Sequence, residues 1–189
     1  SINTTTGAYT YVVDASAVNA LDAGDSTTDD FTIAVSDGDD TDTDSLSISI
    51  VAANDTPSVD AISAPADVND TAADDTYANV TGTTTASDRD ADDTLTYGVG
   101  SAGTASEVGT YGTLTVNTTT GAYSYDPAEA TVNALPAGAS VTDVFTIEVA
   151  DAGLLTDSDT LTITINPVND TPTVVAAISD QNDDDGETI

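Results

Sequence analysis

The sequence predicts an all-β fold, built as a tandem array of antiparallel β-sandwiches with about seven strands in each repeat. Apolar and polar residues alternate along short segments such as 31–35, 46–50 and 161–165, which is the period of a strand with one buried face. Helical spacing of apolar residues is nowhere sustained, and Thr, Val, Ile and Tyr dominate these segments, as a pleated, half-buried surface favours. The third observation is a long internal repeat.

The repeat returns with an offset of 114 residues in its first part and 115 in its last part, so one residue is inserted between them. Agreement over several separated segments cannot arise by chance, and it indicates a repeating unit of about 115 residues. The matching segments are 3–11 with 117–125, 30–37 with 144–151, 46–50 with 161–165, and 54–57 with 169–172.

This repeat divides the chain into three parts. Residues 1–57 form the C-terminal half of a preceding repeat, 58–172 form one complete repeat, and 173–189 begin a following β-sandwich domain. Half a unit cannot close a hydrophobic core by itself, and the chain begins at Ser1 without an initiator methionine. We therefore expect a longer polypeptide that extends in both directions as a tandem array. Strand donation between separate copies is the alternative.

The alternation also predicts where the strands of the complete repeat lie. We expect a hairpin between 114–116 and 123–125, in which Gly121 is free to adopt a positive φ. We expect no α-helix longer than two turns in this repeat. The predicted strands are 58–63, 77–85, 94–99, 113–117, 122–126, 143–150 and 160–166.

The composition excludes several classes of function. The chain has 34 acidic residues against one basic residue, Arg89, a formal net charge of -33, and no His, Cys, Met or Trp. It therefore lacks a conventional base for a Ser or Thr nucleophile, a thiolate, and the nitrogen and sulfur ligands of zinc or copper. Such a charge would repel nucleic acid. The chain has no apolar run long enough for a transmembrane helix, so we expect no direct membrane insertion.

The densest acidic segment, 88–93, places four carboxylates in six residues just before a predicted strand. Such neighbours repel one another, and a divalent cation would offset the repulsion. Hard oxygen ligands in this number suit calcium better than magnesium. A solvated turn is the alternative interpretation. The segment is not an EF-hand loop, because Asp93 occupies the required Gly position and Val99 that of the closing Glu.

Two further signals are weaker. The motif Asn-Asp-Thr-Pro follows the last strand of each unit, at 54–57 and again at 169–172, where Pro ends the strand and stiffens a linker; a plain turn is the alternative. A run of aspartates at 37–44 lies between two predicted strands, but its counterpart at 151–159 is much less acidic. That loss favours a solvated loop over a calcium site.

These motifs, taken together, resemble a known family. The segments 109–117, 121–125, 132–135 and 143–151, followed by Asn-Asp-Thr-Pro, are similar to the VCBS-type, cadherin-like tandem repeat of large bacterial surface adhesins, which are biofilm-associated and RTX-type. The resemblance covers most of 58–172, and 1–57 as well. It implies an extracellular array of immunoglobulin-like or cadherin-like sandwiches, often exported by type I secretion, with calcium at the junctions between domains.

The resemblance also implies particular metal ligands. In this family a linker Asn-Asp and an Asp-x-Asp loop of the next domain share the ion, and the counterpart of the 88–90 loop for the domain that begins at 173 is missing from the sequence. The site after the complete repeat is therefore expected to lack part of its ligands. The implied ligands are Asn54, Asp55, Asp88 and Asp90 at the first junction, with Asp92 and Asp93 as further candidates, and Asn169 and Asp170 at the second.

The function predicted from these observations is a non-catalytic, extracellular structural or adhesive segment of a secreted or cell-surface fibre, rigidified by Ca²⁺. Its expected partners are neighbouring repeats and a cell-surface or matrix polysaccharide. A carbohydrate-binding module is one alternative, because Tyr9, Tyr11, Tyr123 and Tyr125 could stack on sugars, although tyrosines at alternate positions usually pack in a core. A glycosidase with paired carboxylates is disfavoured by the absence of long cleft-forming insertions. Adaptation to high salt is another explanation of the acidity, and six Asn-x-Thr sequons fit a glycosylated surface protein.

Overall fold

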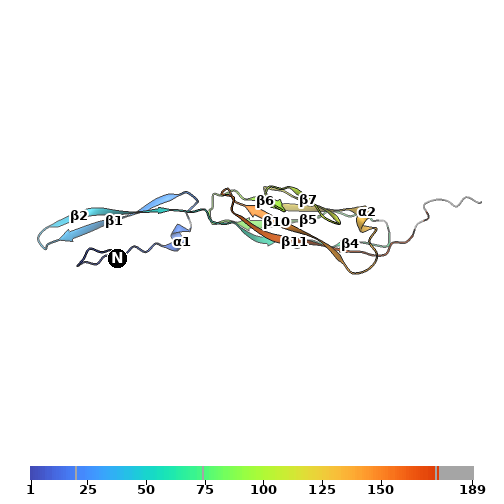
Figure 1. Cartoon of the computed structure of the whole chain (residues 1–189), viewed down its shortest axis with the longest axis horizontal. Coiled ribbons are helices and arrows are strands. Elements are labelled where there is room, and N and C mark those ends of the chain that lie inside the picture. The colour runs from blue at the N-terminus through green and yellow to red at the C-terminus, as the bar shows by residue number, and fades with distance from the viewer. Residues whose placement is uncertain (20, 74, 173, 175–189) are drawn as a thin grey trace, which may run out of the picture.

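The computed structural model describes residues 1–19, 21–73, 75–172 and 174, and these form an elongated molecule (Figure 1). The half repeat contributes a long hairpin of β1 (Ser26–Ser36) and β2 (Thr41–Val51) at one end, and the complete repeat forms a sandwich in the middle of the view. The described helices, α1 (Ala15–Val18) and α2 (Glu129–Val132), have four residues each. Neither is long and apolar enough to cross a membrane.

The complete repeat is a β-sandwich of two sheets, as the alternation predicts. One sheet has the strand order β4 (Val68–Asn69), β11 (Thr156–Asn166), β10 (Val141–Ala150) and β6 (Thr96–Val99). The other has the order β3 (Ser58–Ile62), β5 (Val80–Ser87), β9 (Ala122–Pro127), β8 (Gly112–Val116) and β7 (Ser106–Val108). All described pairings are antiparallel except the short parallel contact between β4 and β11.

The core of this sandwich forms from the residues that the period of two selects. Phe145, Ile147 and Val149 of β10 are buried, as are Leu161 and Ile163 of β11, while the residues between them face away from the core, most of them exposed. The opposite sheet contributes further buried residues from β8 and β9. They are Leu114, Val116, Tyr123 and Tyr125.

A buried aspartate ties the two sheets together at one side of the core. The carboxylate of Asp143 accepts hydrogen bonds from the backbone N–H groups of Thr110 (2.8 Å) and Tyr111 (2.9 Å) and from the hydroxyl of Tyr125 (2.7 Å). Burial and the neighbouring Asp143 raise the pKa of Tyr125. The ring of Tyr125 meets Phe145 edge-on, with a centroid separation of 6.0 Å. A buried carboxylate is tolerated here because donors surround it.

The β8–β9 hairpin confirms the role predicted for Gly121. Its φ is +68°, and a Cβ at this position would lie 2.3 Å from the backbone oxygen of Thr84. Any larger residue would therefore be strained in conformation and would also clash with β5.

The structure differs from the sequence prediction in several strands. Strands β4 and β7, with two and three residues, were not predicted, because segments so short show no alternation. Strand β5 begins at Val80 and not at Tyr77, whose hydroxyl is instead held near Asp70 and Asn133, 2.6 Å from each. The aspartate run at 37–44 is only partly a loop, because β2 (Thr41–Val51) begins inside it.

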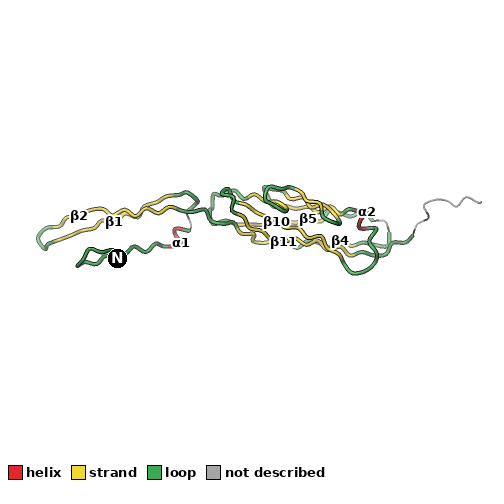
Figure 2. The backbone as a smooth tube through the Cα atoms, viewed as in Figure 1, coloured by secondary structure: helices red, strands yellow, loops and turns green. Residues whose placement is uncertain are grey.

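The half repeat keeps the local structure of its counterpart in the complete repeat. Strand β1 (Ser26–Ser36) pairs with β2 along their whole length (Figure 2). Phe31 lies opposite Leu46 in this hairpin, as Phe145 lies opposite Leu161 in the β10–β11 pair. Both helices also fall at equivalent positions of the repeat. Local sequence therefore determines these elements even where the rest of the sandwich is absent.

Candidate metal centre

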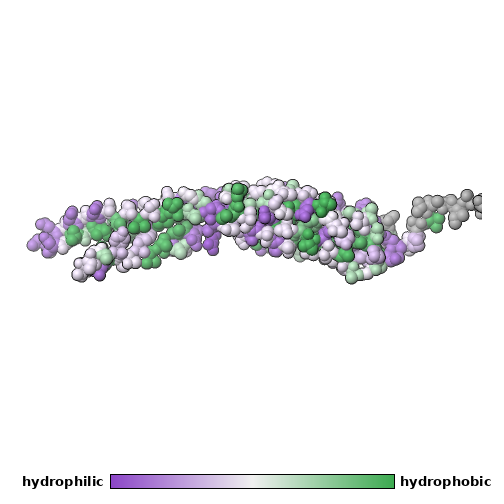
Figure 3. Space-filling model, viewed as in Figure 1, coloured by the Kyte–Doolittle hydropathy of each residue, from purple (hydrophilic) through white to green (hydrophobic). Residues whose placement is uncertain are grey.

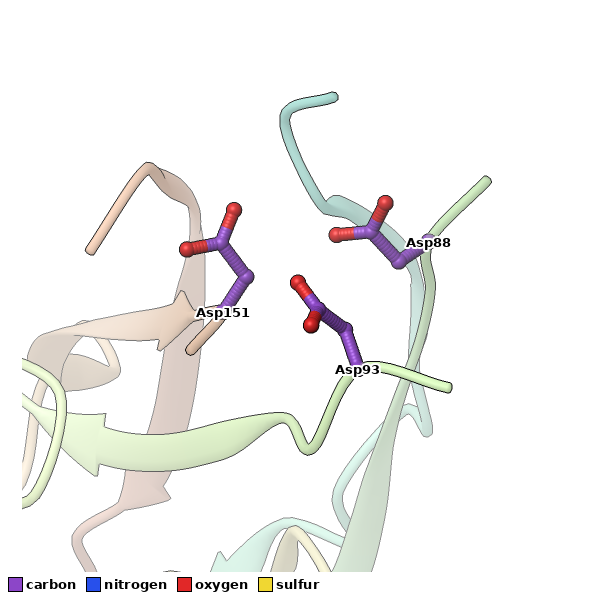
Figure 4. Close-up of side chains that lie close together, drawn as sticks. All are labelled: Asp88, Asp93 and Asp151. Atoms are coloured by element: carbon purple, nitrogen blue, oxygen red, sulfur yellow. The ribbon is translucent and has the colours of Figure 1, made fainter. Parts of the chain in front are cut away.

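Three aspartates converge at the end of the complete repeat that faces the half repeat. Asp88 follows β5, Asp93 precedes β6, and Asp151 follows β10. Each offers a carboxylate oxygen, and these oxygens all lie within 4.8 Å of one another. Figure 4 shows the three carboxylates facing a common space, with Asp151 approaching from the opposite side to Asp88.

Local hydrogen bonds hold the loops that present these aspartates. In the 88–93 loop, the backbone N–H of Asp90 donates to Oδ1 of Asp88 (3.1 Å), and the N–H of Asp93 donates to the carbonyl of Asp90 (3.0 Å). In the β10–β11 turn, Oδ1 of Asp151 accepts from the N–H of Leu155 (2.8 Å). Asp, with its short side chain, suits such turns. The carboxylates are therefore positioned by their own backbone.

The linker between the two repeats is bound to the same group. The N–H of Asp55 donates to Oδ2 of Asp90 (2.7 Å), and Nδ2 of Asn54 donates to Oδ2 of Asp151 (2.8 Å). Space beside Asn54 is limited, because a Cβ on Gly153 would lie 2.6 Å from its Oδ1. The linker is thus attached to both loops of the complete repeat.

The half repeat adds a further carboxylate. Oδ1 of Asp22, in the loop between α1 and β1, accepts from the N–H of Ala91 (2.7 Å). The negative charge of Asp22 also acts on Asp93. Both repeats and the linker therefore meet at this one group of aspartates.

The electrostatics of this group are unfavourable without a cation. Asp90 and Asp151 are only 1% and 3% exposed. Three buried carboxylate oxygens, Oδ2 of Asp88, Oδ1 of Asp90 and Oδ2 of Asp93, have no hydrogen-bond partner among the described residues. Burial, and then the negative charges of Asp151, Asp90, Asp88 and Asp22, raise the pKa of Asp93. The chain's one basic side chain, Arg89, is exposed.

The donor set fits a hard divalent cation. An equilateral triangle with 4.8 Å sides has its centre about 2.8 Å from each corner, close to the calcium–oxygen distances of about 2.3–2.6 Å. Small side-chain movements would bring all three oxygens into reach of one ion. Calcium accepts many carboxylate ligands in irregular geometry, whereas magnesium requires a tighter octahedron and retains water. The arrangement can hold a cation, and it can thereby connect three segments of the chain.

The structure places the sequence-predicted residues at two sites. Asn54, Asp55, Asp88, Asp90 and Asp93 come together at the first junction, linked by the contacts described above. The side chain of Asp92 is exposed, and it does not belong to the three-carboxylate group.

Sequence reasoning missed two residues of the first junction, Asp151 and Asp22. Asp151 has a counterpart, Asp37, that follows the equivalent strand in the half repeat. That shared position is a signal that could have identified Asp151. Asp22 corresponds to Pro136 in the complete repeat, so the repeat itself contains no signal for it.

Asn169 and Asp170 lie at the opposite end of the complete repeat. Their local geometry repeats that of the first linker, because Nδ2 of Asn169 donates to the carbonyl of Asp170 at 2.9 Å, as Asn54 does to Asp55 at 3.0 Å. The neighbouring Val168 N–H donates to Oδ2 of the buried Asp70. Residues 175–189, which belong to the following domain expected after this junction, lie outside the described residues. A second metal site therefore stays a prediction.

The raised pKa of Asp93 predicts an unusual response to pH. Its pKa is higher in the folded state than its ordinary 3.8, so protonation favours folding, and this contribution to stability is lost as the pH rises through the folded pKa. In chelator, Asp93→Asn should therefore stabilise the complete repeat at pH about 7 and give a progressively smaller gain as the pH falls toward about 4. Thermal unfolding across this range measures the difference; a gain that does not depend on pH would contradict it.

A protein-family model agrees with this architecture. Residues 54–167 match the model of the family described as bacterial cadherin-like domain. Among solved structures, the crystal structure of Drosophila N-cadherin EC1-4 is similar at 16% identity and a TM-score of 0.42, covering 79% of this chain and 35% of that chain. This chain thus spans about a third of the length of that structure. A search of curated proteins found no match. Because the family model matches more than half of the residues of this chain, the chain belongs to the bacterial cadherin-like domain family.

Proposed function

We propose that this chain is a non-catalytic extender segment of a VCBS-type surface adhesin or secreted fibre, in which calcium at the junction between repeats holds them in line. The segment acts outside the cell, and its direct partners are the neighbouring repeats of the same polypeptide. The family assignment supports an adhesive or structural repeat, and the junction geometry supports a cation at this place.

One observation carries the proposal. Buried oxygens of three neighbouring aspartates have no hydrogen-bond partner among the described residues, although buried polar atoms in folded proteins are normally satisfied. Ionised carboxylates left in this state are strongly unfavourable. A calcium ion held by Asp88, Asp93 and Asp151 would give Asp88 and Asp93 the missing partner, and it would neutralise part of the charge that raises the pKa of Asp93.

The mechanism follows from which segments the site joins. Asp88, Asp90, Asp93 and Asp151 lie in loops of the complete repeat, while Asn54 and Asp55 belong to the linker and Asp22 to the half repeat. A joint between two domains moves by default unless its interface is large. An ion that fixes the 88–93 loop and Asp151 also fixes Asp90 and Asp151, to which the linker is hydrogen-bonded. It likewise fixes Ala91, whose N–H donates to Asp22 of the half repeat. The relative orientation of the two repeats then becomes restricted.

The positions of Tyr123 and Tyr125 disfavour the sugar-binding alternative in the complete repeat. Tyr123 and Tyr125 are 3% and 0% exposed, so neither ring can stack on a sugar. The hydroxyl of Tyr123 donates to the carbonyl of Ser63 (2.7 Å) and that of Tyr125 to Asp143. Both are core residues of the complete repeat.

Calorimetric titration of the chain with calcium tests the proposal directly. We expect saturable binding with a Kd of about 10⁻⁴–10⁻³ M, the range of extracellular calcium modules. Asp88→Asn should remove most of the heat, whereas Asp92→Asn, in the same loop but exposed, should leave it nearly unchanged. Magnesium should bind more weakly. Equal heats for both variants would show that the loop only attracts counterions, as adaptation to high salt would require.

A further inference from the structure

A second feature, independent of the candidate metal centre, is the parallel contact between β4 and β11. Every other described pairing in the complete repeat is antiparallel, whereas β4 pairs in parallel with Ile165 and Asn166 at the end of β11. Strand β11 is the last strand of the repeat, and only β3 and a short loop separate β4 from the incoming linker. The contact therefore joins the segment that enters the sandwich to the segment that leaves it.

Hydrogen bonds continue this contact beyond the paired strands. The backbone N–H of Asp70 donates to the carbonyl of Asn166 (3.1 Å). In return, Nδ2 of Asn166 donates to Oδ1 of Asn69 (2.9 Å) and to Oδ2 of Asp67 (3.2 Å). Two residues farther on, the N–H of Val168 donates to Oδ2 of Asp70 (3.0 Å). Both main chains and their side chains thus take part.

The contact ends in the linker that follows β11. The N–H of Thr171 (3.3 Å) and its hydroxyl (2.8 Å) both donate to the carbonyl of Ala72, and Thr171 belongs to the second Asn-Asp-Thr-Pro motif. The partners advance together along the chain, so the segments 67–72 and 165–171 lie side by side in parallel. We call these two segments the clamp.

Tension on the chain would act on the clamp along its strands. Figure 1 shows the incoming linker at one end of the sandwich and the segment after β11 leaving at the opposite end, with β4 beside β11. The space-filling view shows the same elongated body (Figure 3). A pull at the two ends therefore draws 67–72 toward the half repeat and 165–171 away from it. Because hydrogen bonds between strands run across them, this pull loads all bonds of the clamp together, in shear.

The clamp also determines which part of the repeat bears the load. Tension that enters through β3 reaches β4, crosses the clamp to the end of β11 and leaves through the following linker. The residues 73–164, which hold most of the buried hydrophobic side chains, stay outside this path while the clamp holds. We propose that the clamp is the load-bearing element of the complete repeat, and that it keeps the core folded when the chain is under tension. It acts within one repeat, whereas the calcium of the proposed function acts between repeats.

Force spectroscopy on the whole chain can load the same bonds in two directions. The chain has no cysteine, so handles can be attached at Ala53→Cys and Val174→Cys, both exposed positions, which loads the clamp in shear. Handles at Thr76→Cys, also exposed, and Val174→Cys follow the two segments on the same side, so the bonds are peeled apart one after another. At equal loading rate, we expect the opening force in shear to be at least about threefold that in peeling.

Side-chain variants test the clamp in the shear direction alone. Asn166→Ala with Thr171→Val removes the side-chain hydrogen bonds that these two residues donate across the clamp. The matched control, Asn79→Ala with Thr104→Val, removes side-chain hydrogen bonds at exposed positions outside the load path. At a fixed force, the clamp variant should open about tenfold faster than the unaltered chain, because forced unfolding follows the opening rate. The control should open at the unaltered rate.

Two results would overturn the proposal. One is an equal opening force in shear and in peeling, because the clamp would then not carry the load. The other is an opening rate of the clamp variant that matches its control. All forces are recorded in chelator, and no residue of the clamp belongs to the three-carboxylate group. Failure of the clamp would therefore leave the calcium proposal standing, and absence of calcium binding would leave the clamp standing.

Discussion

Replacing Asp88 and Asp93 with asparagine should abolish the calcium-dependent rise in the Tm of the complete repeat. Calcium at about 10 mM and a Kd of about 10⁻⁴–10⁻³ M stabilise the folded state by about 1.4–2.7 kcal/mol. For a unit of this size, that corresponds to an increase in Tm of about 5–12 °C. The double variant lacks two of the three converging carboxylates, so its Tm should hardly respond to calcium.

The same variant should behave in the opposite way in chelator. Without the ion, Asp88 and Asp93 repel their neighbours, and the neutral amides remove this repulsion while Oδ1 of residue 88 can still accept from the N–H of Asp90. Its Tm in chelator should therefore equal or exceed that of the unaltered chain. The control, Asp92→Asn with Asp126→Asn, removes the same charge from two exposed positions and should keep the full calcium response. A lower Tm of the double variant both in calcium and in chelator would show that the loop stabilises the fold without an ion.

The second large effect concerns equivalent residues of the two repeats. Phe145→Ala should destabilise the complete repeat by about 3–5 kcal/mol, because it removes a buried ring and leaves a cavity. Phe31→Ala, the same change at the same repeat position, should cost less than about 1 kcal/mol, because Phe31 is already 43% exposed. Urea denaturation monitored by tyrosine fluorescence measures both.

These two variants separate the effect of the local sequence on stability from the effect of the surrounding core. The segments around Phe31 and Phe145 are closely similar and occupy the same place in the register, so a difference in cost reports only the missing half of the core. If both variants lost the same free energy, the half repeat would be folding cooperatively with the complete one, and the side of its hairpin that carries Phe31 would not be an open core.

The fold was predictable because the alternation of residues extends over whole strands. In β10 and β11, inward residues such as Ile147 and Ile163 alternate with outward residues, most of them Thr, over much of each strand, which leaves one register that buries them. Strands β4 and β7 depend instead on neighbours in space. Val68 pairs with Ile165, almost a hundred residues away, and no local pattern records such a contact.

The candidate metal centre could be located from the sequence only where its residues are adjacent. The density of carboxylates at 88–93 indicated a cation near that loop, and the resemblance to adhesin repeats implied Asn54, Asp55, Asp88 and Asp90 as ligands. Composition cannot distinguish Asp90 from Asp92 within this loop. The structure does, because Asp90 is buried and Asp92 is exposed. Asp151 joins the group only because the β10–β11 turn folds beside that loop.

Calcium at this site is proposed to restrict the joint between the two repeats. The chain has no cysteine, so spin labels can be placed uniquely through Thr28→Cys in β1 and Thr119→Cys in the β8–β9 turn, both exposed positions. Pulsed electron paramagnetic resonance then gives the distribution of distances between the two repeats. It should be recorded at matched ionic strength, because monovalent salt also screens the repulsion.

We predict a narrow distribution in calcium, a clearly broader one in chelator, and a broad one in both conditions when Asp88→Asn and Asp93→Asn are present. Distributions of equal width with and without calcium in the otherwise unaltered chain would contradict the account, because the aspartates at the junction would then not control the joint.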